Sequence, residues 1–221
     1  IALELLQDSR VTAVGLHIEG IVNPKDFEKL AREAKALKKG IVALKVGNSK
    51  LAENATVTHT ASMAGNYQGA IALLNKLAIA TVDGLESFLN TLMILHVHQP
   101  ITGNKIASLS CSGGEASLIA DLAEPLHFTF PKLSPKQKRK LKSALGDLVH
   151  LSNPLDYQTY VWDDQVKLTM AFKTMMEETY DFLFIIMDLP KQSRCSSDAW
   201  YPAIAALKEA KKNAKCPVGL I

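Results

Sequence analysis

The chain has 221 residues, 48% of them hydrophobic and 21% charged, so it can bury one large or two modest cores and is no disordered tail. Its 25 Lys and Arg against 22 Asp and Glu leave a net charge of +3, too small a surplus for a nucleic-acid-binding surface. Apolar runs such as residues 182–187 are far shorter than the roughly 20 residues of a membrane span, and no signal sequence is recognisable, so we expect a cytoplasmic protein.

The first half of the chain alternates apolar strands with helices. In chain order the pattern predicts the end of a helix at 1–7, a strand at 11–19, a helix at 24–39, a strand at 41–46, a helix around 70–77, a short strand at 81–82 and a helix to about 98. The helix at 24–39 has clear ends, with Asn23 as N-cap and Gly40 just beyond the last turn. Asp83 with Glu86 is typical of another helix start.

A turn-rich stretch, Q-P-I-T-G-N-K at 99–105, divides the chain, and we place a domain boundary between residues 1–99 and 100–221. The same alternation then restarts. It predicts a strand at 105–110, a helix at 114–124, an extended piece at 127–130, a helix from 134, a helix at 164–179, a strand at 182–187, a helix at 198–212 and a strand at 217–221. Strands separated by helices, twice over, predict two α/β units with parallel sheets flanked by helices.

Three cysteines, Cys111, Cys195 and Cys216, are an odd number with no C-x-x-C pair. This pattern fits neither a disulfide framework nor a zinc site, so we expect reduced thiols. His96 and His98 are two residues apart on a predicted helix and point to different faces, which makes them a poor metal pair. We therefore expect no metal site.

The most unusual stretch is T-V-T-H-T-A-S-M-A-G-N-Y-Q-G at 56–69, where His59 stands among small and hydroxylated residues. Small side chains let backbone amides approach a ligand, and Gly65 with Asn66 can open a helix whose N-terminus favours an anion such as phosphate. The alternative is that His59 lies exposed in an ordinary polar loop.

A second candidate is S-C-S-G-G-E at 110–115, a glycine loop between an apolar strand and a helix. Free amides at the helix start can hold a phosphoryl group, which makes Ser112, Gly113 and Gly114 candidate phosphate-binding residues. The loop matches neither nucleotide-binding glycine motif, and a plain tight turn with Glu115 as a first-turn charge is the alternative.

A third candidate is Glu19, which ends a buried strand where ligand crevices of parallel sheets lie. Its carboxylate could fix the tautomer of a histidine and leave the other imidazole nitrogen as a nucleophile. The alternative is that Glu19 caps the turn at 20–24. We read the charge run at 136–142 as a solvated helix face, and favour surface packing over substrate contact for Trp162 and Trp200.

Five stretches together resemble the nucleoside-diphosphate-forming acyl-CoA synthetases, which include succinyl-CoA synthetase and the ADP-forming acetate–CoA ligases. In the family's order they are G-L-H-I-E-G-I at 15–21, I-V-A-L-K-V-G at 41–47, T-H-T-A-S-M-A-G at 58–65, S-C-S-G-G at 110–114 and N-P-L-D-Y at 153–157. The third looks like the family's S-H-T-G-S-L-A-G phosphohistidine loop, with Ala61 where glycine is common.

This resemblance implies two flavodoxin-like units of the succinyl-CoA-synthetase kind. Residues 1–99 would be the C-terminal part of the phosphohistidine-carrying ligase-CoA domain, and residues 100–221 a second such domain. It further implies that His59 is phosphorylated and that Glu19 pairs with it. Ser112, Gly113 and Gly114 would start one of the two helices that hold the phosphohistidine.

The implied reaction makes acyl-CoA, ADP and phosphate from a carboxylic acid, CoA and ATP, through an acyl phosphate. ATP/ADP, Mg²⁺ and CoA would be bound mainly by an ATP-grasp domain and a Rossmann-type CoA-binding domain, on the same or a partner chain. We therefore expect an internal segment of a longer, oligomeric enzyme that makes no acyl-CoA alone. The alternative is a noncatalytic regulatory or interaction module of the same fold, as in synthetase-like lysine acetyltransferase fusions.

Overall fold

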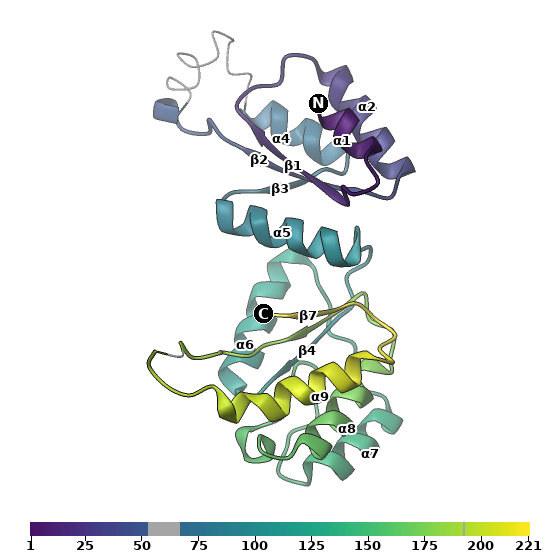
Figure 1. Cartoon of the computed structure of the whole chain (residues 1–221), viewed down its shortest axis with the longest axis vertical. Helices are drawn as coiled ribbons and strands as arrows, with labels where there is room; N and C mark the ends of the chain where they lie inside the picture. Colours follow the sequence, from purple (N-terminus) through teal and green to yellow (C-terminus); the bar gives the residue numbers. More distant parts are fainter. Residues whose placement is uncertain (53–66, 192) are drawn as a thin grey trace. The chain divides into compact units, whose positions relative to one another are not determined.

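The computed structural model describes residues 1–52, 67–191 and 193–221, and the chain divides into two units, Ile1–Ile101 and Thr102–Ile221 (Figure 1). Both units consist of parallel strands flanked by helices, so the predicted α/β class with two parallel sheets is confirmed. Within the described ranges, no helix is both long and apolar enough to cross a membrane.

The first unit has a three-stranded parallel sheet in the order β1-β2-β3. Its elements are α1 (Ala2–Gln7), β1 (Ala13–Ile18), α2 (Pro24–Ala36), β2 (Gly40–Lys45), α4 (Tyr67–Lys76), β3 (Ala80–Val82) and α5 (Leu85–His98). Figure 1 shows α1, α2 and α4 on one face of the sheet and α5 on the other. Buried side chains of α1, α2 and α4 meet those of β1 and β2 in the core, which includes Leu6, Leu30 and Leu74.

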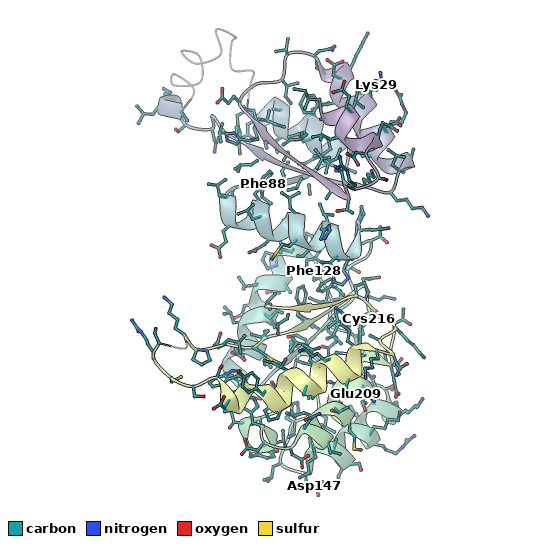
Figure 2. All side chains as sticks on the ribbon, viewed as in Figure 1. Lys29, Phe88, Phe128, Asp147, Glu209 and Cys216 are labelled. Carbon is teal, nitrogen blue, oxygen red and sulfur yellow. The ribbon has the colours of Figure 1, made fainter. Side chains whose placement is uncertain are left out.

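Glycines let α5 approach the other face of this sheet closely. A Cβ atom built on Gly40 would lie 2.5 Å from Cδ2 of Leu95, and one on Gly15 would lie 2.5 Å from Cζ of Phe88, which Figure 2 shows between α5 and the sheet. The prediction that Gly40 ends the preceding helix was therefore wrong. Helix α2 ends at Ala36, Lys38 takes the left-handed turn with φ 55°, and Gly40 is the first residue of β2.

The start of α5 also differs from the prediction. Gly84, in an extended conformation, is the N-cap, and its carbonyl accepts the first helical hydrogen bond from the amide of Phe88 at 3.0 Å. Asp83 lies one residue too early to cap the helix. The predicted cap was wrong because a glycine occupies the cap position without any side-chain bond.

The second unit has a four-stranded parallel sheet in the order β5-β4-β6-β7. Its elements are β4 (Ile106–Ser110), α6 (Gly113–Ala123), η1 (Glu124–Leu126), α7 (Pro135–Leu145), β5 (Leu155–Asp156), η2 (Thr159–Val161), α8 (Gln165–Met176), β6 (Phe182–Ile185), η3 (Asp198–Trp200), α9 (Tyr201–Lys211) and β7 (Val218–Leu220). The core lies between the sheet and α7, α8 and α9, with Phe172, Met175 and Leu183 fully buried.

Two local predictions in this unit need correction. The extended piece at 127–130 makes only one bridge, between Lys105 and Thr129, because His127 turns the chain with φ 59°. Asp198 starts the 3₁₀ turn η3 and does not cap α9, which begins at Tyr201. The predicted start of α7 is confirmed, because Ser134 and Gln137 form a reciprocal capping box.

Candidate functional site

Glu19 directly follows β1 and lies at the carboxyl edge of the first sheet. With Gly20, Val22 and Phe27 it lines an open depression of about 740 Å³ that runs along β1. Among the described residues the Glu19 carboxylate has no hydrogen-bonding partner, so the structure does not show it capping the turn that follows. A strand-end carboxylate without a partner is free to accept a hydrogen bond from a ligand or an imidazole.

Lys45, at the end of the neighbouring strand β2, is the residue that the sequence analysis missed here. Its side chain is only 4% exposed, and burial lowers the pKa of its ammonium group. The ammonium donates hydrogen bonds to the backbone carbonyls of Glu19, at 2.9 Å, and Val46, and it lies 5.4 Å from the ring centroid of Tyr67. The available signal was a single lysine inside the apolar strand I-V-A-L-K-V-G.

In the second unit, Ser112 is the N-cap of α6, and Gly113 and Gly114 are its first two residues. The first intrahelical bond runs from the amide of Ala116 to the carbonyl of Ser112 at 3.1 Å, so the amides of residues 113–115 precede the helical ladder. The Ser112 side chain makes no capping bond. This helix start can therefore donate several backbone hydrogen bonds to an anion.

A carboxylate also lies close to this helix start. A Cβ atom on Gly113 would lie 3.4 Å from Oδ2 of Asp156, the last residue of β5. Burial, followed by the negative charges of Asp188 and Asp156, raises the pKa of Glu115 in the first turn of α6. From sequence alone Glu115 was interpreted only as a first-turn charge, because the approach of β5 to this helix start depends on how the sheet is assembled.

Two further groups border these carboxylates. Tyr157 is fully buried, and its hydroxyl has no hydrogen-bond partner among the described residues. Burial, with the nearby acidic groups Cys111, Glu115 and Asp156, raises the pKa of the Tyr157 hydroxyl well above its ordinary value. Burial also raises the pKa of the Cys111 thiol. Both groups are thereby kept in their neutral forms.

The predicted site residues are not all described, and those that are lie in different units. His59 and the whole T-H-T-A-S-M-A-G loop lie outside the described residues. Glu19 belongs to the first unit and Ser112, Gly113 and Gly114 to the second, each at the carboxyl edge of its own sheet. Within the described ranges, no three His, Cys, Asp or Glu side chains are grouped so as to hold a metal ion.

The other candidates show structural contacts. The rings of Trp162 and Trp200 meet edge to face with their centroids 4.9 Å apart, and Trp162 packs on the core of the second unit. His96 shares a hydrogen bond of 2.7 Å with the hydroxyl of Thr12. The half-exposed Lys140 of α7 pairs with Glu177, the C-cap residue of α8, at 2.6 Å.

Comparison with known proteins identifies the class. Residues 2–95 match the model of the succinyl-CoA ligase like flavodoxin domain. The chain shares its fold, over 99% of its length, with a solved structure from Ca. Korarchaeum cryptofilum. That protein is described as a dinucleotide forming acetyl-coenzyme A synthetase 1 in complex with phosphate and ADP. Its TM-score is 0.77 at 18% identity, and the match covers 48% of that chain. The fold is therefore that of a flavodoxin-like CoA ligase.

Curated relatives make the family more specific. The alpha subunit of the ADP-forming acetate–CoA ligase II of Pyrococcus furiosus is 30% identical over 70% of this chain and 34% of its own length. The trans-feruloyl-CoA synthase FCS1 of an unknown prokaryotic organism is 28% identical over 79% of this chain and 25% of its length. The resemblance to the NDP-forming acyl-CoA synthetases is thus confirmed, and this chain spans a quarter to a third of these relatives.

Proposed function

We propose that this chain is part of an NDP-forming acyl-CoA synthetase that makes acyl-CoA from a carboxylic acid, CoA and ATP. In this proposal residues 1–99 belong to the phosphohistidine-carrying domain and residues 100–221 form the second ligase-CoA-like domain. The observation that carries the proposal is the Glu19 carboxylate at the end of β1, which has no hydrogen-bonding partner among the described residues and lies in a stretch that resembles the family's. The resemblance puts the phosphorylated histidine, His59, with it.

The chemistry divides one difficult transfer into easier steps. A nitrogen of His59 attacks the γ-phosphorus of ATP; an N–P bond forms, the P–O bond to ADP breaks, and ADP leaves with the electron pair. The carboxylate of the acid then attacks the same phosphorus, which gives an acyl phosphate and frees His59. The sulfur of CoA attacks the acyl carbon, and phosphate leaves.

Glu19 contributes to the first step by accepting a hydrogen bond from the second imidazole nitrogen of His59. This bond holds the tautomer in which the attacking nitrogen has its lone pair free, and it stabilises positive charge that develops on the ring. Lys45 supports this role, because its hydrogen bond to the backbone carbonyl of Glu19 fixes the backbone that bears the carboxylate.

The start of α6 contributes by binding the transferred phosphoryl group. Amides of Gly113 and Gly114, at the positive end of the helix dipole, replace the water that a phosphoryl dianion loses. ATP, CoA and Mg²⁺ would be bound mainly by ATP-grasp and CoA-binding domains on the same or a partner chain. The described residues do not fit a Mg²⁺ site, and none of the steps assigned to this chain uses the metal.

Labelling tests the proposal directly. Acetyl phosphate with a ³²P label supplies an activated phosphoryl group without a nucleotide domain, so the chain itself should acquire acid-labile, base-stable label. His59→Ala and His59→Asn should remove the label, whereas the control His150→Asn, at an exposed position, should keep it. Label that survives both His59 variants would overturn the assignment. Absence of label from the folded parent chain, and from mixtures with ATP and an ATP-grasp partner, would favour the noncatalytic module.

A further inference from the structure

The positive charge of the chain is concentrated in one short segment. Six of its 25 Lys and Arg lie between residues 132 and 142, and no Asp or Glu stands among residues 125–146. The other 19 Lys and Arg are outnumbered by the 22 Asp and Glu, so the chain outside this segment is net negative. The net charge of +3 therefore comes from helix α7 and the residues that lead into it.

Helix α7 turns these cations away from the core. Its buried residues lie on one side of the helix and are Gln137, Leu141, Ala144 and Leu145. The other side carries two rows of lysines, Lys136 with Lys140 and Lys138 with Lys142, whose members are one helical turn apart. Arg139 lies between the two rows. The exposed cations form what we call the α7 basic surface: Lys132, Lys136, Lys138, Arg139 and Lys142.

Carboxylates of the chain neutralise only part of this charge. Within the described ranges two of the six cations form ion pairs, Lys140 with Glu177 at 2.6 Å and Lys142 with Asp147 at 2.7 Å. Lys132, Lys138 and Arg139 have neither a hydrogen bond nor an ion pair in that part of the structure. The surface therefore keeps unpaired positive charge that is open to solvent.

The placement of these charges is unfavourable for the helix by itself. The first turn of α7 holds Lys136 and no acidic residue, although the N-terminus of a helix favours negative charge. The two lysines of each row are like charges at i and i+4, which repel each other. Sequences break local rules of this kind mainly at functional positions. The charge pattern therefore indicates an external partner that supplies negative charge.

The surroundings of the surface fit a short acidic protein segment better than a nucleic acid or a membrane. Glu177 and Asp147 border the cations and would repel a phosphate backbone, which carries its charge without interruption. The apolar residues of α7 face the core, so the helix has no apolar face to place in a lipid bilayer. A short segment rich in Asp and Glu can end within the surface, and its carboxylates match the donor fork of Arg139.

We infer that the α7 basic surface docks an acidic segment of a partner protein, whose carboxylates pair with Lys136, Lys138 and Arg139. The inference goes beyond the proposed function and uses none of the residues assigned to phosphoryl transfer. Contacts of this kind stay partly solvated. They therefore weaken with salt, and they contribute mainly to the choice of partner and the rate of encounter.

Binding of a fluorescent peptide of about eight Glu residues to the 221-residue chain tests this inference, because an extended peptide of that length can follow the whole surface. Fluorescence anisotropy gives the affinity, and ¹⁵N-resolved spectra show whether the amide signals of α7 shift. Raising NaCl from about 50 to about 300 mM should weaken binding about tenfold or more. A neutral Gly-Ser peptide of the same length should not bind, and equal binding of the two peptides would overturn the inference.

A matched pair of triple variants separates this surface from overall charge. Lys136→Gln/Lys138→Gln/Arg139→Gln should lose about tenfold or more in affinity for the Glu peptide, since three exposed charge contacts disappear. The control Lys25→Gln/Lys29→Gln/Arg32→Gln removes the same charges from exposed positions of α2 and should stay within about twofold of the parent. Equal losses in the two variants, or binding without shifts in α7, would refute the docking surface.

The variant Lys136→Glu tests the argument that these cations disfavour the helix. An acidic residue in the first turn, one turn before Lys140, should raise the midpoint of thermal unfolding by about 1–2 °C. The same change should weaken binding of the Glu peptide about threefold or more. A lowered midpoint would remove the basis of the inference, and an unchanged affinity would contradict it directly.

Two further probes check the class of partner. Tighter binding of a short duplex DNA or of phosphatidylserine vesicles than of the Glu peptide, with shifts in the same α7 amides, would overturn the assignment to an acidic protein segment. The labelling of His59 should be equal in the parent and in the α7 triple variant. Failure of the docking surface and failure of the proposed function are therefore read from separate experiments.

Discussion

The ammonium group of Lys45 donates a hydrogen bond of 2.9 Å to the backbone carbonyl of Glu19, and thereby ties the end of β2 to the end of β1. The adjacent carbonyl of Val46 accepts a second bond from the same group. A lysine buried to this degree loses hydration, and its lowered pKa records that loss. The two carbonyls compensate for it, so Lys45 holds the loop that bears Glu19.

Replacing Lys45 by Met keeps an unbranched side chain one atom shorter and removes all three donors. We expect a loss of about 1–3 kcal/mol in the free energy of unfolding, because the Glu19 and Val46 carbonyls lose charge-assisted bonds. Urea titration measures the change, with the exposed Lys50→Met as control. Equal stability of Lys45→Met and the parent would show that the two bonds merely offset the cost of burying the charge.

Glu19→Gln separates chemistry from folding. The carboxylate has no partner among the described residues, so we expect the unfolding free energy to change by less than about 0.5 kcal/mol. Phosphoryl transfer through His59 should slow by about 10² to 10⁴, the usual scale for an acid–base or orienting partner. Quench-flow labelling measures the rate, and a rate within about twofold of the parent would show that Glu19 takes no part in the transfer.

Local chemistry explains which parts of the fold could be predicted. The start of α7 was predictable because Ser134 and Gln137 satisfy each other's backbone within four residues of sequence. Gly40 was misassigned because a glycine after a helix commonly ends that helix. Here it instead leaves room for the side chain of Leu95, which is distant in sequence. The strand β5, with only two residues, leaves no periodic pattern to detect.

The candidate site divides in the same way. Glu19 and the Ser112 to Gly114 loop could be proposed from sequence, since strand ends and glycine loops are visible there. Lys45 and Tyr157 could not be proposed from sequence, because only the folded structure shows that they are buried. The Lys45 ammonium is held by two backbone carbonyls, and the Tyr157 hydroxyl has no partner among the described residues. Burial of a polar group depends on elements distant in sequence.

The approach of α5 to the sheet predicts a specific coupling. Gly40→Ala should cost about 1–3 kcal/mol of unfolding free energy, because the new methyl group would overlap Cδ2 and Cγ of Leu95. In the double variant Gly40→Ala/Leu95→Ala, part of this cost should disappear, since the smaller side chain leaves room for the methyl group. Strict additivity of the two single effects in urea titrations would contradict the close contact.

Tyr157→Phe tests whether the buried hydroxyl costs stability. The ring packs edge to face on Phe172 with centroids 5.3 Å apart, and phenylalanine keeps that contact. Removing a buried hydroxyl without a partner should leave the unfolding free energy equal to or above that of the parent, by up to about 1–2 kcal/mol. A clear loss of stability in thermal or urea unfolding would mean that the hydroxyl has a protein partner in solution.

Nζ of Lys140 lies 2.6 Å from Oε2 of Glu177, and this ion pair joins α7 to the end of α8. The hydrogen bond from Lys140 is the largest cause of the lowered pKa of Glu177. A lowered folded-state pKa stabilises the fold above the ordinary value of 4.5, and this contribution disappears as pH falls through the folded value. Both side chains are about two-fifths exposed, so solvent screening limits the contribution to about 0.2–1 kcal/mol.

A double-mutant cycle with Lys140→Met and Glu177→Gln should give that coupling near neutral pH, and it should vanish at pH values below the folded pKa of Glu177. High salt should weaken it, because both side chains are partly open to solvent. Glu178→Gln, the neighbouring carboxylate, serves as the control and should show no coupling to Lys140. If the coupling persisted unchanged at acidic pH, the contact between α7 and α8 would have to be one of packing between the side-chain stems and not of charge.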